Sequence, residues 1–182
     1  MQQLLNNLSD TIDDYFKVPL RSGEFEFIEE NAGCKKVILQ SKRRQVFAFS
    51  LDKNLPNRCK MFPFLNQSTP IINKVNDGII FYWKNNEIFV LLIELKTTNL
   101  GDYTKQLHAG KNFVFYLLGI LNNSFSKSYT IEENNIKCLV FSLRNTARKQ
   151  GTRRKTISYE SVNGLNIAEL QCNDTHILEK FI

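Results

Sequence analysis

The feature that most constrains the fold is an almost uninterrupted apolar segment, residues 88–95, near the middle of the chain. Only Glu94 breaks it, and the segment is far shorter than the roughly 20 residues that cross a bilayer. A strand that is apolar on both faces lies in the centre of a sheet covered on both sides. The mostly apolar segment 77–83 precedes it, and the polar, asparagine-containing stretch 84–87 between the two is typical of a β-hairpin. The sequence therefore predicts a sheet built around this hairpin.

Hydrophobic periodicity predicts the elements around the hairpin. Apolar residues at steps of three and four indicate helices at 3–16 and 102–121. The segment 53–76, which carries three of the four prolines, is expected to be a long connection. The order of helices and strands predicts an α/β (α+β) fold with one mixed sheet. The other expected elements are strands at 24–27, 37–40, 46–51, 136–143, 156–159 and 167–171, and a helical turn at 177–182.

The length of the chain indicates one domain. With 182 residues it can bury a sizeable core but is too short for two comfortable domains, so we expect a single domain over 1–182. The hydrophobic fraction of 42% and the charged fraction of 23% are those of a globular protein and argue against wholesale disorder. The N-terminal residues have neither the basic region nor the apolar region of a signal peptide, and no segment predicts a membrane span.

The cysteines give a prediction about the compartment. They are widely spaced and include no closely spaced pair of the kind that binds zinc. Cys172 and His176 are four residues apart, which we interpret as coincidence. Nor is this a small cysteine-dense framework, so we expect reduced thiols in a cytoplasmic protein. The four are Cys34, Cys59, Cys138 and Cys172.

The charge of the chain favours polyanionic partners. There are 24 Lys and Arg against 18 Asp and Glu, which gives a net charge of +6. Half of the twelve residues in the segment 144–155 are cationic and none is acidic, so a loop there could hold nucleic-acid phosphates. The alternative is a solvated basic loop without a partner. The cations are Arg144, Arg148, Lys149, Arg153, Arg154 and Lys155.

Candidate catalytic groups follow the apolar segment. Glu94 and Lys96 are two apart in a strand and therefore project from the same face. Burying both charges costs several kcal/mol unless they pair with each other or bind a ligand. Two interpretations stay open, a salt-bridged pair at the end of a strand and a functional site.

A third charged group is expected beside them. If residues 85 and 86 form the centre of the hairpin turn, antiparallel pairing sets Asp77 opposite Glu94. Two carboxylates with a lysine alongside form a hard-oxygen site suited to Mg²⁺ or Mn²⁺. Such a site can activate water for attack on a phosphate ester. The alternative for Asp77 is an ordinary turn residue before Gly78.

These residues resemble the core of the PD-(D/E)xK, or restriction-endonuclease-like, nuclease superfamily. Asp77 followed by an apolar strand, and then Glu94-Leu95-Lys96, is similar to the superfamily's D…E-x-K motif. The resemblance covers about residues 70–143 and implies an αβββαβ core with a mixed sheet. It also implies that Asp77 and Glu94 bind the metal, and that Gln106, on the helix after the motif, supports the site. Asn76 stands where the motif has proline.

Many members of the superfamily carry a further acidic residue on the first helix or strand. This sequence offers several at suitable positions and does not choose among them. The candidates are Asp13, Asp14, Glu24, Glu26, Glu29 and Glu30.

The resulting functional expectation is a metal-dependent nuclease, with DNA rather than RNA as the substrate and an endonuclease as the activity. Asp77, Glu94, Lys96 and Gln106 would form the catalytic site. Cutting both strands of a duplex favours a homodimer, and a partner subunit is the other possibility. The alternatives are a catalytically inactive nucleic-acid-binding module and an interaction subunit of a larger restriction, repair or defence assembly. Tyr82 and Trp83 are expected to be packing residues rather than platforms for nucleic-acid bases.

Overall fold

The structure is a computed structural model that describes residues 2–29, 33–53, 74–97, 101, 103–143 and 157–182. Its largest element in this part of the chain is a six-stranded sheet with the order β3-β4-β5-β6-β8-β7. The mixed α/β architecture predicted from the sequence is confirmed. The strands of this sheet are β3 (Val46–Phe49), β4 (Gly78–Lys84), β5 (Glu87–Lys96), β6 (Ile136–Ser142), β7 (Glu160–Val162) and β8 (Leu165–Gln171).

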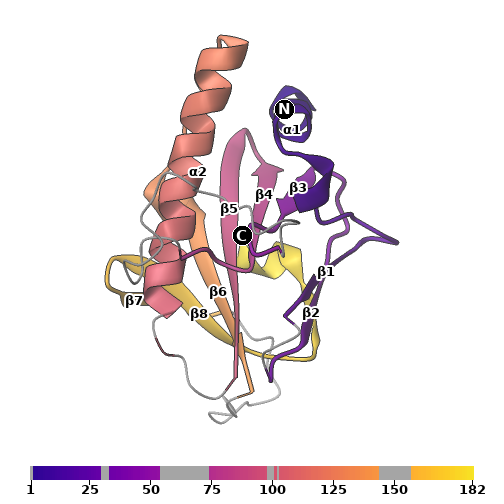
Figure 1. Cartoon of the computed structure of the whole chain (residues 1–182), viewed down its shortest axis with the longest axis vertical. Helices are drawn as coiled ribbons and strands as arrows, with labels where there is room; N and C mark the ends of the chain where they lie inside the picture. The colour runs from indigo at the N-terminus through magenta and orange to yellow at the C-terminus, as the bar shows by residue number, and fades with distance from the viewer. Residues whose placement is uncertain (1, 30–32, 54–73, 98–100, 102, 144–156) are drawn as a thin grey trace.

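The direction of the strands changes at the centre of this sheet. Strands β3, β4 and β5 form an antiparallel meander, and β6 then lies parallel to β5. Helix α2 (Tyr103–Phe125) makes the crossover between β5 and β6 and covers one face of the sheet (Figure 1). Strand β8 is parallel to β6, and β7 is antiparallel to β8.

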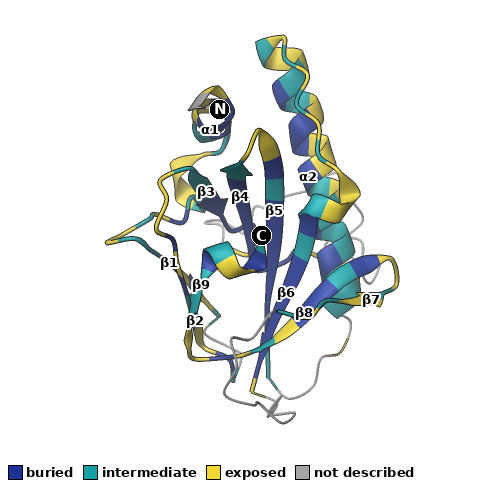
Figure 2. Cartoon of the chain, turned by 180° about the vertical axis from the view of Figure 1, so that it is seen from behind, coloured by how far each residue is buried: buried dark blue, intermediate teal, exposed yellow. Residues whose placement is uncertain are grey.

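Strand β5 is buried on both faces, as its apolar sequence predicts. Val90 and Leu92 pack in the core formed with α2 and helix α1 (Gln2–Thr11). Leu91 and Ile93 alternate with them and pack in a second core on the opposite face of the sheet. The strand is buried without interruption from Val90 to Leu95, and most of it is dark blue in Figure 2.

The opposite face is covered by a separate small sheet, and here the prediction of one sheet is wrong. Strands β1 (Glu24–Ile28) and β2 (Lys36–Gln40) pair antiparallel, and β9 (Thr175–Ile177) adds parallel to β2. The alternating burial of β1 explains the arrangement, because Phe25 and Phe27 need an apolar surface to cover. They find it on the larger sheet, where a Cβ atom at Gly78 would overlap the ring of Phe27.

Two elements near the ends of the chain differ from the prediction. The first helix ends at Thr11, and a short 3-10 helix, η1 (Asp14–Phe16), follows, with Asp13 accepting a hydrogen bond of 2.8 Å from the backbone N–H of Tyr15. The strand expected at 156–159 lies instead at β7, because Asn163 and Gly164 form a tight turn with positive φ that sets the β7–β8 hairpin. The final helical turn is confirmed as η4 (Leu178–Phe181), and a further 3-10 turn, η3 (Glu133–Asn135), precedes β6.

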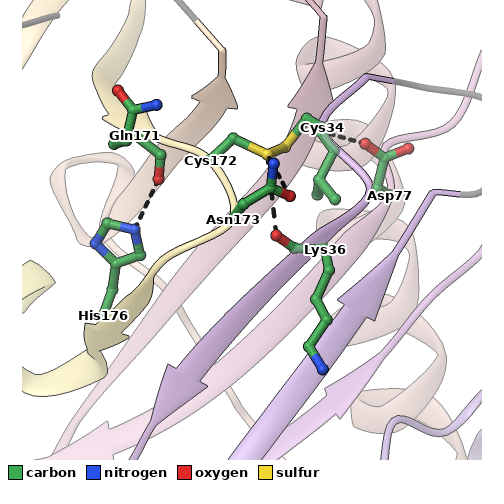
Figure 3. The surroundings of a disulfide bond; sticks show 8 residues. Cys34, Lys36, Asp77, Gln171, Cys172, Asn173 and His176 are labelled. Atoms are coloured by element: carbon green, nitrogen blue, oxygen red, sulfur yellow. Dashed lines mark hydrogen bonds between the residues drawn. A yellow bond between two sulfur atoms is a disulfide. The ribbon is translucent and has the colours of Figure 1, made fainter. Parts of the chain in front are cut away.

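A disulfide joins the two sheets, which corrects the prediction of reduced thiols for Cys34 and Cys172. Their Cα atoms lie 5.6 Å apart although 138 positions separate them in the sequence. Parallel pairing of β2 with β9 brings the two segments together, and the backbone N–H of Asn173 donates to the carbonyl of Lys36 (Figure 3). His176 contacts the carbonyl of Gln171 at 2.9 Å, and Cys172 is committed to the disulfide, so the pair is not a metal site. Cys138 is a free, buried thiol, and Cys59 lies outside the described residues.

No helix in the described residues is both long enough and apolar enough to span a membrane. Most of the connection expected at 53–76 and the basic segment 144–155 lie outside the described residues. The single-domain organisation and the cytoplasmic location stay predictions.

Candidate active site

The β4–β5 hairpin brings the first two candidate residues together. Asn85 and Asn86 both have positive φ and form the turn, as expected. Gly78 pairs with Ile93 in the register that follows from this turn, so the next position on each strand, Asp77 and Glu94, is opposite the other. Asp77 is not a solvated turn residue, because it is 8% exposed and its Oδ2 accepts a hydrogen bond of 2.5 Å from the backbone N–H of Leu95.

Lys96 and Gln106 extend this pair toward α2. The ammonium of Lys96 lies 2.5 Å from Oε1 of Glu94, so the salt bridge considered from the sequence is present. The same ammonium donates to Oε1 of Gln106 at 2.6 Å. The amide nitrogen of Gln106 donates in turn to the backbone carbonyl of Val75 at 3.2 Å. The four predicted catalytic residues therefore come together where β5 ends, next to the first turns of α2.

Burial disfavours the charged forms of both carboxyl groups. Glu94 is 0% exposed, and burial followed by the charge of Asp77 raises its pKa to about 9, although Lys96 opposes this shift. Burial likewise raises the pKa of Asp77 to about 7, against the lowering effect of the Leu95 N–H. The buried Oε2 of Glu94 has no hydrogen-bond partner among the described residues. An additional cation at this position would stabilise the ionised forms of both groups.

Two further carboxylates reach the same place. Glu29, just after β1, and Asp52, shortly after β3, each place a carboxylate oxygen within 4.8 Å of the other and of one on Asp77. Burial and then the neighbouring Glu29 raise the pKa of Asp52. The group lines a pocket of about 270 Å³ together with Leu95, Lys96, Thr97 and Gln106. Three carboxylates converging on a pocket form a donor set suited to a hard divalent cation.

The sequence signal for Glu29 is its position in β1. Phe25 and Phe27 face the larger sheet, and Glu29 continues their face by two residues. Since Phe27 packs over Gly78, the neighbour of Asp77, Glu29 arrives beside that carboxylate. Asp52 was missed, and its only signal is that it follows the apolar end of a predicted strand.

The other acidic candidates have different roles or positions. Asp13 caps η1, and Asp14 pairs with Lys17 at 2.5 Å. Glu24 accepts a hydrogen bond from Gln40 at 2.8 Å, and Glu26 pairs with Lys36. Glu30 lies outside the described residues.

The residues predicted to bind nucleic acid cannot be placed relative to this pocket. They lie outside the described part of the chain: Arg144, Arg148, Lys149, Arg153, Arg154 and Lys155. Tyr82 and Trp83 are packing residues, as expected, because Tyr82 is buried in one core and Trp83 packs against the other.

The chemistry available at the pocket follows from these contacts. The carboxylates of Glu29, Asp52 and Asp77 can hold a divalent cation, and Lys96, which lines the same pocket, pairs with the buried Glu94. Gln106 restricts the position of the lysine through a hydrogen bond to its ammonium. Such a set can bind and orient a water molecule and a phosphate oxygen.

Comparison with known proteins supplies no relative. No protein-family model matches the chain, and no match is found among the curated proteins or the solved structures.

Proposed function

We propose that the protein is a metal-dependent nuclease that hydrolyses phosphodiester bonds, with DNA as its substrate and Mg²⁺ or Mn²⁺ as its cofactor. The observation that carries the proposal is that Asp77 and Lys96 line one pocket with Glu29 and Asp52. The buried Glu94 does not line this pocket, but it pairs with the ammonium of Lys96. Burial raises the pKa of both carboxyl groups, so their ionisation in the folded protein costs free energy unless a cation lies beside them. Such a pair argues against a purely structural role.

The order of the elements supports the same proposal. Strands β1 and β2, which belong to the separate small sheet, lie between α1 and β3 in the chain. Without them, helix α1, the meander β3-β4-β5, the crossover α2 and the parallel strand β6 have the order αβββαβ. This is the order that the resemblance to the restriction-endonuclease-like superfamily implies. The motif residues occupy the ends of the second and third strands of the meander, and Gln106 is on the crossover helix.

The roles of the residues follow from their surroundings. Asp77 would hold the cation together with Glu29 and Asp52, which line the pocket with it. Glu94, the buried neighbour of Asp77, would be a further ligand, as the resemblance implies. When bound, the cation would neutralise charge on the phosphate and lower the pKa of a coordinated water. Lys96 would orient the attacking water and stabilise the developing negative charge, and Gln106 would keep the ammonium in position.

The test is incubation of the purified chain with closed circular DNA, linear duplex DNA, single-stranded DNA and RNA. Each substrate is offered with Mg²⁺, with Mn²⁺ and with EDTA. We expect cleavage of DNA with either cation and none with EDTA, and cutting of the closed circle would establish endonuclease activity.

Two lysine variants sharpen this test. Lys96→Ala should abolish cleavage, whereas Lys127→Ala removes the same charge just beyond the far end of α2 and should leave cleavage intact. Salt-sensitive binding without cleavage would support the inactive nucleic-acid-binding module instead. If the protein neither binds nor cleaves nucleic acid, the result would support the interaction subunit.

A further inference from the structure

Helix α2 approaches the start of β4 unusually closely at one residue, Gly110. A Cβ atom at this position would overlap the side-chain amide of Asn76, both its Oδ1 and its Cγ. Gly119, nine residues further along the same helix, has open space where its Cβ would lie. The close approach is therefore specific to the turn of α2 that faces Asn76.

Asn76 is held in this position by the hairpin below it. It is 0% exposed, and its amide nitrogen donates to the carbonyl of Gly78 at 2.5 Å and to that of Ile93 at 3.4 Å. Gly78 and Ile93 are paired, and they are the immediate neighbours of Asp77 and Glu94. The amide of Asn76 therefore fastens the two strands together at the position where the two carboxylates leave them.

The oxygen of the same amide faces α2. Asn76 Oδ1 is buried, has no hydrogen-bond partner among the described residues, and is the atom nearest to the open position at Gly110. Because Asn76 is fixed by its two donated bonds, it cannot yield to a larger residue at 110 without losing them. A methyl group there would have to move the helix or rotate the amide.

Gln106 lies one turn before Gly110 and on the same side of α2. Its amide bridges Lys96 and the carbonyl of Val75, the residue before Asn76. A shift of α2 at Gly110 would therefore be transmitted to the ammonium of Lys96 through a hydrogen bond only 2.6 Å long.

We propose that Asn76 and Gly110 are positioning residues: their contact sets the distance between α2 and the hairpin, so that Gln106 places Lys96 for the reaction. The inference rests on the proposed nuclease function. It assigns a role to an asparagine at the position where the superfamily's motif has proline, and to a glycine inside a helix. Glycine there lowers helix stability relative to alanine, so the close approach supplies the reason for its presence.

The cleavage experiment compares Gly110→Ala with Gly119→Ala, a matched control on the same helix. Gly110→Ala should lower kcat by about tenfold or more, because displacements of about 1 Å reduce rates to this extent or further. KM should stay within about twofold, because the displaced group is not the one that gathers the substrate. Gly119→Ala should leave both constants unchanged.

A stability experiment tests the contact without reference to cleavage. Gly119→Ala should raise Tm by about 2–4 °C through helix propensity. Gly110→Ala should lower Tm relative to the wild type. In a protein that already carries Asn76→Ala, and so lacks the amide, the same substitution should raise Tm. A rise in both backgrounds would show that the contact does not exist and would overturn the inference.

The two experiments separate the possible failures. A wild-type protein that cleaves no substrate overturns the proposed function and the positioning role with it. Wild-type cleavage with an unchanged kcat in Gly110→Ala overturns the positioning role alone, even if Tm falls. A fall in kcat for Gly110→Ala with no change for Gly119→Ala supports the proposal.

Discussion

Replacing Asp77 by asparagine should stabilise the metal-free protein at neutral and alkaline pH. The pKa of Asp77 is raised from 3.8 to about 7, chiefly by burial. Since the folded pKa lies above the unfolded one, the folded state binds the proton more tightly, and stability falls as pH rises from about 4 to about 7. Asparagine has no such titration, and its side-chain oxygen can still accept the hydrogen bond from Leu95.

The magnitude follows from the shift. A change of roughly 3 pKa units corresponds to about 4 kcal/mol at about 1.36 kcal/mol per unit. This is an upper estimate, because relaxation of the folded state in the variant and in the wild type will absorb part of it. The free energy of unfolding of Asp77→Asn should therefore match that of the wild type near pH 4 and exceed it, by up to about 4 kcal/mol, at pH 8.

The assay is urea denaturation at pH 4, 6 and 8 in EDTA, repeated with excess Mg²⁺. In Mg²⁺ the wild type should gain stability and Asp77→Asn should gain little, because the variant has lost a ligand. Asp10→Asn, at an exposed position on α1, is the matched control and should show neither effect. If Asp77→Asn is no more stable than the wild type at pH 8 in EDTA, burial of Asp77 does not destabilise its ionised form.

Three further predictions concern the same site and its support. Mg²⁺ affinity, measured by calorimetry, should rise between pH 6 and 9, because the pKa of Glu94 is about 9 and bound Mg²⁺ requires the ionised form; Glu94→Gln should flatten this dependence. Glu29→Gln and Asp52→Asn should each weaken Mg²⁺ binding about tenfold and leave residual cleavage at high Mg²⁺, and unchanged affinity in both would exclude them as ligands. Replacing Cys34 and Cys172 together by serine should lower the free energy of unfolding by about 5 kcal/mol at most, the value that the loop-entropy model gives for a separation of 138 positions. A reductant should lower the free energy of unfolding of the wild type by the same amount.

The hairpin and its site could be predicted because both depend on local rules. The apolar segment and the asparagine turn determine which residues of β4 and β5 are opposite each other. Counting positions from the turn along both strands therefore predicts that Asp77 lies opposite Glu94. Lys96 shares a strand face with Glu94, and Gln106 is on the helix that must return across the sheet.

The remaining features depend on packing between distant segments. Glu29 and Asp52 join the site only because β1 packs over Gly78 and because β3 borders β4, neither of which follows from periodicity. The disulfide was missed for the same reason, since the pairing of β2 with β9 joins segments from opposite ends of the chain.

The role of Lys96 in cleavage is tested most directly by nicking of closed circular DNA by the wild type, Lys96→Ala and Lys127→Ala, with Mg²⁺ and with EDTA. We expect Mg²⁺-dependent nicking by the wild type and by Lys127→Ala, and none by a folded Lys96→Ala. Equal nicking by the wild type and Lys96→Ala, or nicking that persists in EDTA, would contradict this expectation.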